Sequence, residues 1–264
     1  MIPKLFHLYW SAPRMPYLRY LTMFTLRHHH PDWRIWLHTA SVWGAAGAWA
    51  REKQDFQRDD GEDWTLRAYA LADRVLPYTA QPQLDPVHQS DFCRWDALRG
   101  GGFFLGFDNF ILRPFDDLLK HRLVLGTFTH RGCLYVYVCM VGAAAGHDFV
   151  EQVRHRLRNA YDKDNYNCTG IPVVTKVLES FRKSGDLDGY YDGGRLFYPA
   201  ETSDDAARIY DGTLAVPADA YALHWYGGHP RSQEFNENYT PDAAEAGRDL
   251  ISLNLRRMFG GVPR

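Results

Sequence analysis

Three charged residues of one segment, Asp91, Arg94 and Asp108, have types and spacing that could support chemistry. Asp91 and Arg94 lie three positions apart in a stretch expected to be helical, so they share a face. Asp108 follows a glycine break and the apolar run Phe103–Leu105, which places it at the carboxyl end of a buried strand. Open α/β sheets bind ligands in the crevice at that end. Two carboxylates and an arginine around one point suit a metal ion bound together with a diphosphate.

The flanking sequence predicts the elements that would hold these side chains in place. An apolar strand over residues 4–10, a helix over 17–29 and an alternating strand over 33–38 open the chain. A strand–helix–strand start predicts a parallel sheet and a doubly wound α/β fold. Further predicted elements are helices over 64–76, 147–160, 172–183 and 242–259, and strands over 123–128, 133–141, 196–198 and 221–226. The sequence contains no internal repeat, so residues 1–264 are predicted to form a single domain.

The composition argues against several classes of protein. Of the 264 residues 45% are hydrophobic, and 30 basic residues nearly balance 32 acidic ones, which disfavours nucleic acid as a partner. The sequence has neither a membrane-spanning apolar run nor a secretion signal, so a cytoplasmic protein without integral membrane association is expected. The cysteines have no paired spacing and are predicted to be reduced, mostly buried thiols; they are Cys93, Cys133, Cys139 and Cys168.

Several motifs follow one another in a fixed order over most of residues 1–230. They are Ile2–Trp10, Pro31-Asp32-Trp33 with Trp36, Ser90-Asp91 with Arg94, Leu98, Gly101-Gly102 and Asp108, and Thr169-Gly170-Ile171-Pro172. This series resembles the DXD-containing glycosyltransferases of the group (family 32) that includes Och-type mannosyltransferases and the large glucosylating toxins. The resemblance implies a GT-A-like (Rossmann-like) fold with a mixed, mostly parallel sheet flanked by helices. Such a fold binds a nucleotide-sugar, with UDP favoured. It also implies a retaining transfer of a hexose or N-acetylhexosamine to an acceptor, whose identity as glycan, protein or small molecule the sequence leaves open.

One position departs from the motif of this family. The first aspartate of Asp-x-Asp is Gly106 here, so the triplet is Gly106-Phe107-Asp108. The resemblance makes Asp108 the direct metal ligand, and Asn109 offers a neutral oxygen beside it. Mn²⁺ and Mg²⁺ both prefer oxygen ligands, so a weakened metal site is expected.

The resemblance also implies roles for residues far from this segment. Trp10 would stack on the base of the donor, which is worth roughly 1–3 kcal/mol. His224, near the C-terminal end of the sequence, would be a further metal ligand, although an ordinary core histidine explains it equally well. Arg231 would bind the diphosphate. Asp91 would bind sugar hydroxyls and Arg94 the leaving diphosphate. Thr169 and Gly170 complete the expected donor site.

Other interpretations remain open at this stage. Asp91 and Arg94 alone would form an ordinary surface ion pair worth a few tenths of a kcal/mol. Gly106 makes a non-catalytic protein that binds nucleotide-sugars or glycans the first alternative. A transferase that glycosylates modified nucleic acid is the second, and the net charge of −2 argues against it.

Overall fold

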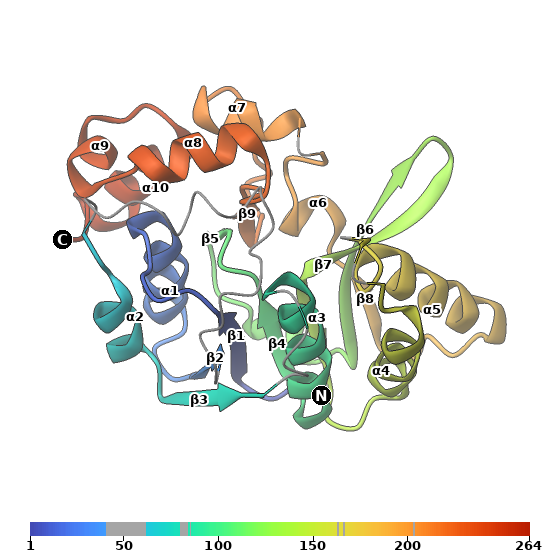
Figure 1. Cartoon of the computed structure of the whole chain (residues 1–264). Coiled ribbons are helices and arrows are strands. Elements are labelled where there is room, and N and C mark those ends of the chain that lie inside the picture. Colours follow the sequence, from blue (N-terminus) through green and yellow to red (C-terminus); the bar gives the residue numbers. More distant parts are fainter. Residues whose placement is uncertain (41–61, 80–83, 85, 163, 166, 203) are drawn as a thin grey trace.

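The computed structural model describes residues 1–40, 62–79, 84, 86–162, 164–165, 167–202 and 204–264. Its centre is a seven-stranded sheet with the order β3-β2-β1-β4-β7-β6-β8 (Figure 1). The strands are β1 (Leu5–Trp10), β2 (Arg34–Ala40), β3 (Arg74–Tyr78), β4 (Gly102–Leu105), β6 (Leu123–His130), β7 (Cys133–Ala143) and β8 (Tyr190–Asp192). Strands β1 to β4 pair in parallel, as does β8 with β6, whereas β7 is antiparallel to both of its neighbours. The predicted mixed, mostly parallel sheet is confirmed.

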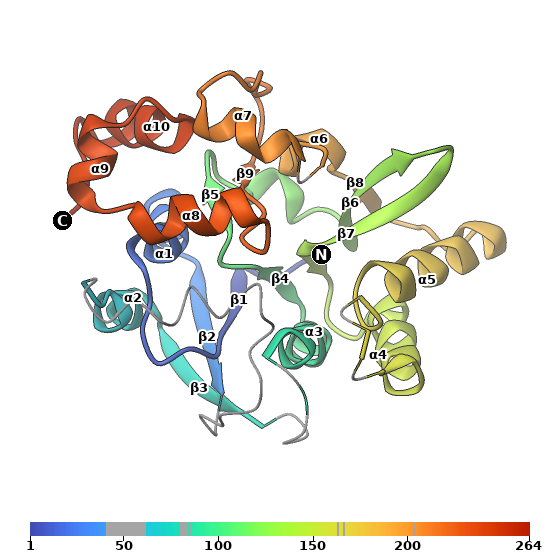
Figure 2. The same ribbon diagram turned by 45° about the horizontal axis from the view of Figure 1, so that its top comes forward.

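The helices form two groups, one on each face of the sheet (Figures 1 and 2). The first group is α3 (Pro86–Ala97), α4 (Asp148–Ala160) and α5 (Ile171–Ser184). The second is α1 (Tyr17–His29), α2 (Thr65–Leu71), α6 (Gly194–Phe197), α7 (Ala207–Tyr210), α8 (Pro230–Asn238), α9 (Pro241–Ala246) and α10 (Leu250–Phe259). Short 3₁₀ turns cover Leu98–Gly100, Asp116–Leu118 and Asp204–Ala206. Among the described residues, no helix combines the length and the apolar character needed to span a bilayer.

Strand β1 is buried on both faces because it lies at the centre of the sheet. Phe6, Leu8 and Trp10 enter the core on the side of α1. Tyr9 enters the core formed with α3, α4 and α5. Helices on both sides explain why the sequence of this strand is apolar at every position except His7 and does not alternate. The end of β1 is therefore fixed from two sides, and Trp10 stands at that end.

A second, smaller sheet positions the end of the glycine-rich segment. Strands β5 (Asn109–Ile111) and β9 (Ala222–His224) pair antiparallel, with Asn109 opposite His224. The hydroxyl of Thr22 on α1 lies 2.9 Å from the carbonyl oxygen of Phe107 and 2.7 Å from that of Asn109. The turn that carries Asp108 is thus held by α1 on one side and by β9 on the other.

Three predicted elements differ from the observed ones. The helix expected over 64–76 ends at Leu71, and β3 follows as an edge strand, where Pro77 is tolerated because no partner needs its missing N–H. Residues 196–198 were expected to form a strand, but most of them belong to the short helix α6. The helix expected over 242–259 divides at Gly247, where a β-carbon would lie 2.3 Å from the hydroxyl oxygen of Ser252.

Two buried histidines are neutral parts of the core. Phe115 N–H donates to Nε2 of His30 at 2.9 Å, and Nδ1 of His30 lies 3.0 Å from the carbonyl oxygen of Leu26. His30 therefore carries its proton on Nδ1, and a second proton would break the bond from Phe115. Burial lowers the pKa of His30 to about 4. Burial, with the charge of His38 as a smaller cause, lowers the pKa of His7 to about 3.

These two histidines predict acid destabilisation that begins well above the range in which carboxylates titrate. Their pKa is lower in the folded than in the unfolded chain, so their stabilisation is complete above pH 6.5 and is lost as the pH falls toward 4. We expect these two groups to lower the free energy of unfolding by about 2–4 kcal/mol between pH 7 and pH 5. His29 and His38, whose pKa burial also lowers to about 4, act in the same direction. Urea unfolding at several pH values gives the free energy of unfolding at each pH, and the slope of this energy against pH is the quantity to compare. The slope should decrease in His30→Gln and stay unchanged in the exposed-site control His155→Gln, and equal slopes in all three proteins would contradict this origin.

Candidate functional site

A cavity of about 630 Å³ opens where β1 and β4 end, between α1, α3, β7 and the start of α5. Its wall contains six of the residues that the sequence nominated: Trp10, Asp91, Arg94, Asp108, Gly170 and His224. They come from parts of the chain more than 200 residues apart. The placement at the carboxyl ends of parallel strands is the one expected for a ligand site in an open α/β sheet.

Asp108 and His224 form a close pair in the wall of this cavity. Oδ2 of Asp108 lies 3.0 Å from Nε2 of His224 and accepts the N–H of Gly227, also at 3.0 Å. Burial alone would raise the pKa of the Asp108 carboxyl, but His224, Arg19 and the Gly227 N–H lower it well below its usual range. Burial opposes the charged form of His224, yet the charges of Asp108 and Cys139 outweigh it and raise its pKa to about 10.

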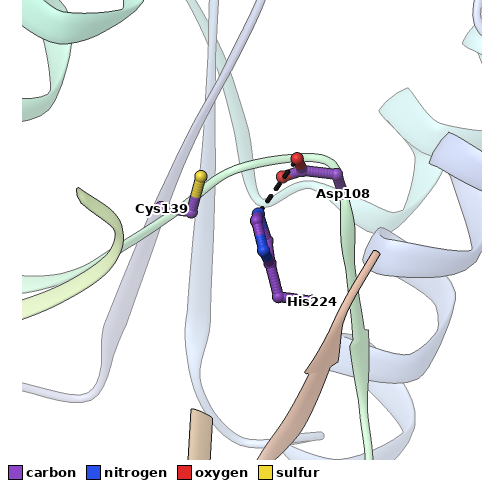
Figure 3. Close-up of side chains that lie close together, drawn as sticks. All are labelled: Asp108, Cys139 and His224. Carbon is purple, nitrogen blue, oxygen red and sulfur yellow. Dashed lines mark ion pairs between the residues drawn. The ribbon is translucent and has the colours of Figure 1, made fainter. Parts of the chain in front are cut away.

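Cys139 of β7 is the third member of this cluster. A carboxylate oxygen of Asp108, a ring nitrogen of His224 and the sulfur of Cys139 all lie within 4.8 Å of one another. Figure 3 shows the three side chains side by side. The three residues belong to three different segments: a turn, the end of β9 and the middle of β7. Carboxylate, imidazole and thiolate are all ligands of divalent transition metals, so this donor set fits such an ion.

Asp91 and Arg94 form a buried pair one turn of α3 apart. Nη1 of Arg94 donates to Oδ1 of Asp91, and the hydroxyl of Thr169 donates to Oδ2 at 2.8 Å. The guanidinium carbon of Arg94 lies 5.0 Å from the ring centroid of Phe104, and its Nε has no hydrogen-bond partner among the described residues. The side chains are only 5% (Arg94) and 7% (Asp91) exposed, so this is not the surface pair of the alternative interpretation.

Three nominated residues do not line this cavity. Thr169 acts through Asp91, because its hydroxyl is bonded to that carboxylate. Asn109 is buried, and its amide donates to the carbonyl oxygen of Gly106 at 2.9 Å, which closes the turn. Arg231 is exposed on α8 and lines a separate cavity of about 390 Å³, so the structure does not bring it to the cluster around Asp108.

Arg19 of α1 lines the cavity, and sequence reasoning missed it. It is 8% exposed, and its guanidinium carbon lies 4.6 Å from the ring centroid of Trp225. A β-carbon on Gly227 would lie 2.5 Å from Nη2 of Arg19, so any other residue at position 227 would require the guanidinium of Arg19 to shift. The signal was present in the sequence, because Arg19 interrupts the apolar run Tyr17–Leu21, and arginine is rarely buried without a partner.

Gly106 has a specific steric role beside Asp108. A β-carbon on Gly106 would lie 2.8 Å from Oδ1 of Asp108 and 3.5 Å from the sulfur of Cys139. The amide of Gly106 donates to the carbonyl oxygen of Cys139 at 2.8 Å, which ties the turn to β7. The carboxylate of Asp108 therefore occupies space that a side chain at position 106 would need.

Scans of the sequence against protein-family models and against curated proteins find no match. Solved structures with a similar fold do exist. The glycosyltransferase GlyE of Streptococcus pneumoniae TIGR4 superposes with a TM-score of 0.52 at 12% identity, over 97% of this chain and 64% of that one. This chain thus corresponds to somewhat less than two thirds of GlyE. PaToxG glycosyltransferase superposes with a TM-score of 0.49 at 14% identity, over 89% of this chain and 87% of that one. At these identities the likeness concerns the fold alone, and the chain shares the mixed α/β fold of the glycosyltransferase GlyE.

Proposed function

We propose that this protein is a glycosyltransferase that moves a hexose or N-acetylhexosamine from a nucleotide-sugar, with UDP favoured, to an acceptor hydroxyl. The observation that carries the proposal is the convergence in one cavity of Asp108 with His224, of Asp91 with Arg94, and of Trp10. These groups meet the needs of such a donor, which are charge compensation for a diphosphate, acceptors for sugar hydroxyls and an aromatic wall for a base. The GT-A fold supports the proposal.

In this proposal Asp91 orients the donor sugar and Arg94 binds the diphosphate. Arg94 and Thr169 use one oxygen each of the Asp91 carboxylate, which has about four lone-pair directions and can still accept a sugar hydroxyl. The unpartnered Nε of Arg94 is a buried donor at the cavity, as a diphosphate oxygen would require. Thr169 is a positioning residue, because it acts through Asp91.

Asp108 and His224 are the proposed metal ligands, with Mn²⁺ or Mg²⁺ as the ions that the sequence suggested. Bound there, a divalent cation would compensate the negative charge that develops on the departing diphosphate. The residues of this chain contribute the rest of the electrostatic stabilisation: Arg94 and Arg19 are fixed cations in a partly enclosed cavity, and they need no reorganisation during the reaction.

The proposed reaction retains the anomeric configuration. The bond between the anomeric carbon and the diphosphate oxygen breaks, and the electron pair leaves with the nucleoside diphosphate. The acceptor oxygen bonds to the anomeric carbon on the same face, and its proton passes to the departing diphosphate oxygen. The walls formed by Asp91 and Arg94 would hold the sugar and the leaving group in this arrangement.

A panel of nucleotide-sugars tests the proposal. Only ligands that bind the folded state raise the melting temperature, so UDP-hexoses with Mn²⁺ should raise it more than the free sugars do. The nucleotide-sugar that raises the melting temperature most is then incubated with the protein, and release of the nucleoside diphosphate is measured with Mn²⁺ and with EDTA. Binding without release of the diphosphate would favour the non-catalytic alternative, and no binding by any nucleotide-sugar would overturn the proposal.

Arg19, not Arg231, is the second arginine of the proposed donor site. Arg19→Gln should weaken binding of the UDP-sugar at least tenfold, because it removes a buried cation close to the diphosphate position. Arg231→Gln is the matched control and should bind like the wild type, because Arg231 lines the separate cavity. Isothermal titration of both variants measures the difference. Equal affinities, or weaker binding only in Arg231→Gln, would contradict this assignment.

Restoring the missing aspartate of the motif is expected to harm the site. In Gly106→Asp the new β-carbon would meet Oδ1 of Asp108 at 2.8 Å, and the two carboxylates would repel each other. We expect about a tenfold loss of kcat/KM, or about 1.4 kcal/mol. Gly100→Asp is the control, because a β-carbon there meets nothing within 4 Å. A gain of activity in Gly106→Asp would show that the turn can adapt and that this steric argument is wrong.

A further inference from the structure

We propose that Cys139 is a third metal ligand beside Asp108 and His224, and that its sulfur makes the site prefer Zn²⁺ or Co²⁺ over Mg²⁺. The inference rests on the metal site of the proposed function and changes its chemistry, since the sequence suggested an oxygen-rich site for Mn²⁺ or Mg²⁺. It also gives a role to Cys139, which the sequence analysis predicted to be a reduced thiol like the other three cysteines.

The three donor atoms are already close to the spacing that one ion requires. Ligand bonds of zinc measure about 2.0–2.3 Å, so the ligand atoms around a tetrahedral ion lie about 3.3–3.8 Å apart. Here all three lie within 4.8 Å of one another, and the pair formed by Asp108 and His224 is at 3.0 Å. Movements of about 1 Å, within reach of side-chain rotation, would bring the set to that spacing.

Backbone contacts fix the relative positions of the segments that carry the ligands. The amide of Gly106 donates to the carbonyl oxygen of Cys139 at 2.8 Å, which links the Asp108 turn to β7. The amide of Trp225 donates to the carbonyl oxygen of Asp108 at 2.9 Å, which links the same turn to the residue after His224. The donor set is therefore assembled by the main chain before any ion binds, as a preformed site requires.

The thiol of Cys139 lies beside position 106, where the motif of the family has an aspartate and this chain has glycine. A β-carbon on Gly106 would lie 3.5 Å from the Cys139 sulfur. The chain thus lacks a carboxylate at position 106 and has the sulfur of Cys139 close to that position. Mg²⁺ requires a near-octahedral shell of oxygen atoms, whereas thiolate and imidazole are both ligands that suit Zn²⁺.

The surroundings leave an open position for a substrate oxygen. Asp108, Cys139 and His224 all line the 630 Å³ cavity, so the ion would face it. The ion would displace a proton from His224, and two negatively charged ligands with one neutral imidazole would then balance a divalent cation. Three protein ligands with one free position is the arrangement of catalytic zinc sites, whereas structural sites have four protein ligands.

Titration of the purified protein with Co²⁺ tests the inference. It requires neither a nucleotide-sugar nor catalytic turnover. Co²⁺ bound by a thiolate gives a sulfur-to-metal charge-transfer absorption, which the wild type should show and Cys139→Ser should lack. Cys133→Ser is the control, because Cys133 is an exposed free cysteine at the start of the same strand, and it should keep the band. Asp108→Asn should weaken Co²⁺ binding and still show the band at saturation.

Competition experiments then measure the preference. Cys139→Ser should bind Zn²⁺ at least tenfold more weakly than the wild type, and its affinity for Mg²⁺ should stay the same. Absence of the band in the wild type, or its persistence in Cys139→Ser, would overturn the inference. Either result leaves the nucleotide-sugar panel unaffected, and failure of that panel with an intact cobalt spectrum would count against the proposed function alone.

Discussion

Asp108→Ala is expected to reduce sugar transfer at least a hundredfold, which corresponds to about 2.7 kcal/mol of activation free energy. The substitution removes the carboxylate that lies 3.0 Å from Nε2 of His224 and that accepts the Gly227 N–H. It therefore takes away a proposed metal ligand and the partner that holds His224 in place. The measurement is kcat/KM for transfer from the nucleotide-sugar identified by the binding panel.

Two further variants separate the chemistry of Asp108 from its structural role. Asp108→Asn keeps the size of the side chain and an oxygen that can accept the Gly227 N–H, but it loses the charge. It should also lose most of the transfer activity while its melting temperature stays close to that of the wild type. Asp188→Ala changes an exposed carboxylate, 91% accessible, and should be fully active. Near-normal turnover in Asp108→Ala would refute the assignment of the site.

Arg94→Met is expected to lower the free energy of unfolding by about 3–5 kcal/mol. Asp91 and Arg94 are both nearly inaccessible, so removal of the arginine leaves a buried carboxylate whose one remaining side-chain hydrogen bond among the described residues is to the Thr169 hydroxyl. Breaking such a pair from one side costs more than the pair itself contributes, because the remaining charge has no solvent. Urea unfolding followed by circular dichroism measures the loss, and transfer activity should disappear as well.

A double-mutant cycle tests this explanation. Asp91→Asn combined with Arg94→Met leaves no isolated charge and should be less destabilised than the sum of the two single variants. The exposed pair of Arg122 and Asp188 is the control, and Arg122→Ala should change the stability by less than about 0.5 kcal/mol. Additive single effects in the buried pair would mean that the two side chains contribute independently.

Much of the fold could be predicted from local patterns. The helix over 17–29 and the strands around Trp10 and Trp33 agree with α1, β1 and β2, because a continuous apolar run and a clear helical stripe have few alternative structures. Strand β3 was missed since its residues are mostly exposed at the sheet edge and include Pro77. Strand β5 was missed because three residues carry too little periodicity to be recognised.

The sequence by itself determined the α/β class and nominated six of the residues that line the cavity, Asp91, Arg94 and Asp108 among them. These residues lie at the ends of strongly patterned elements, where local spacing is informative. Only the tertiary structure decided that Arg19 and Cys139 line the cavity and that Arg231 does not. The neighbours of Arg19 and Cys139 are distant along the chain, so these contacts depend on how α1, β7 and β9 pack together. The hydrophobic periodicity of a single segment contains no information on such packing.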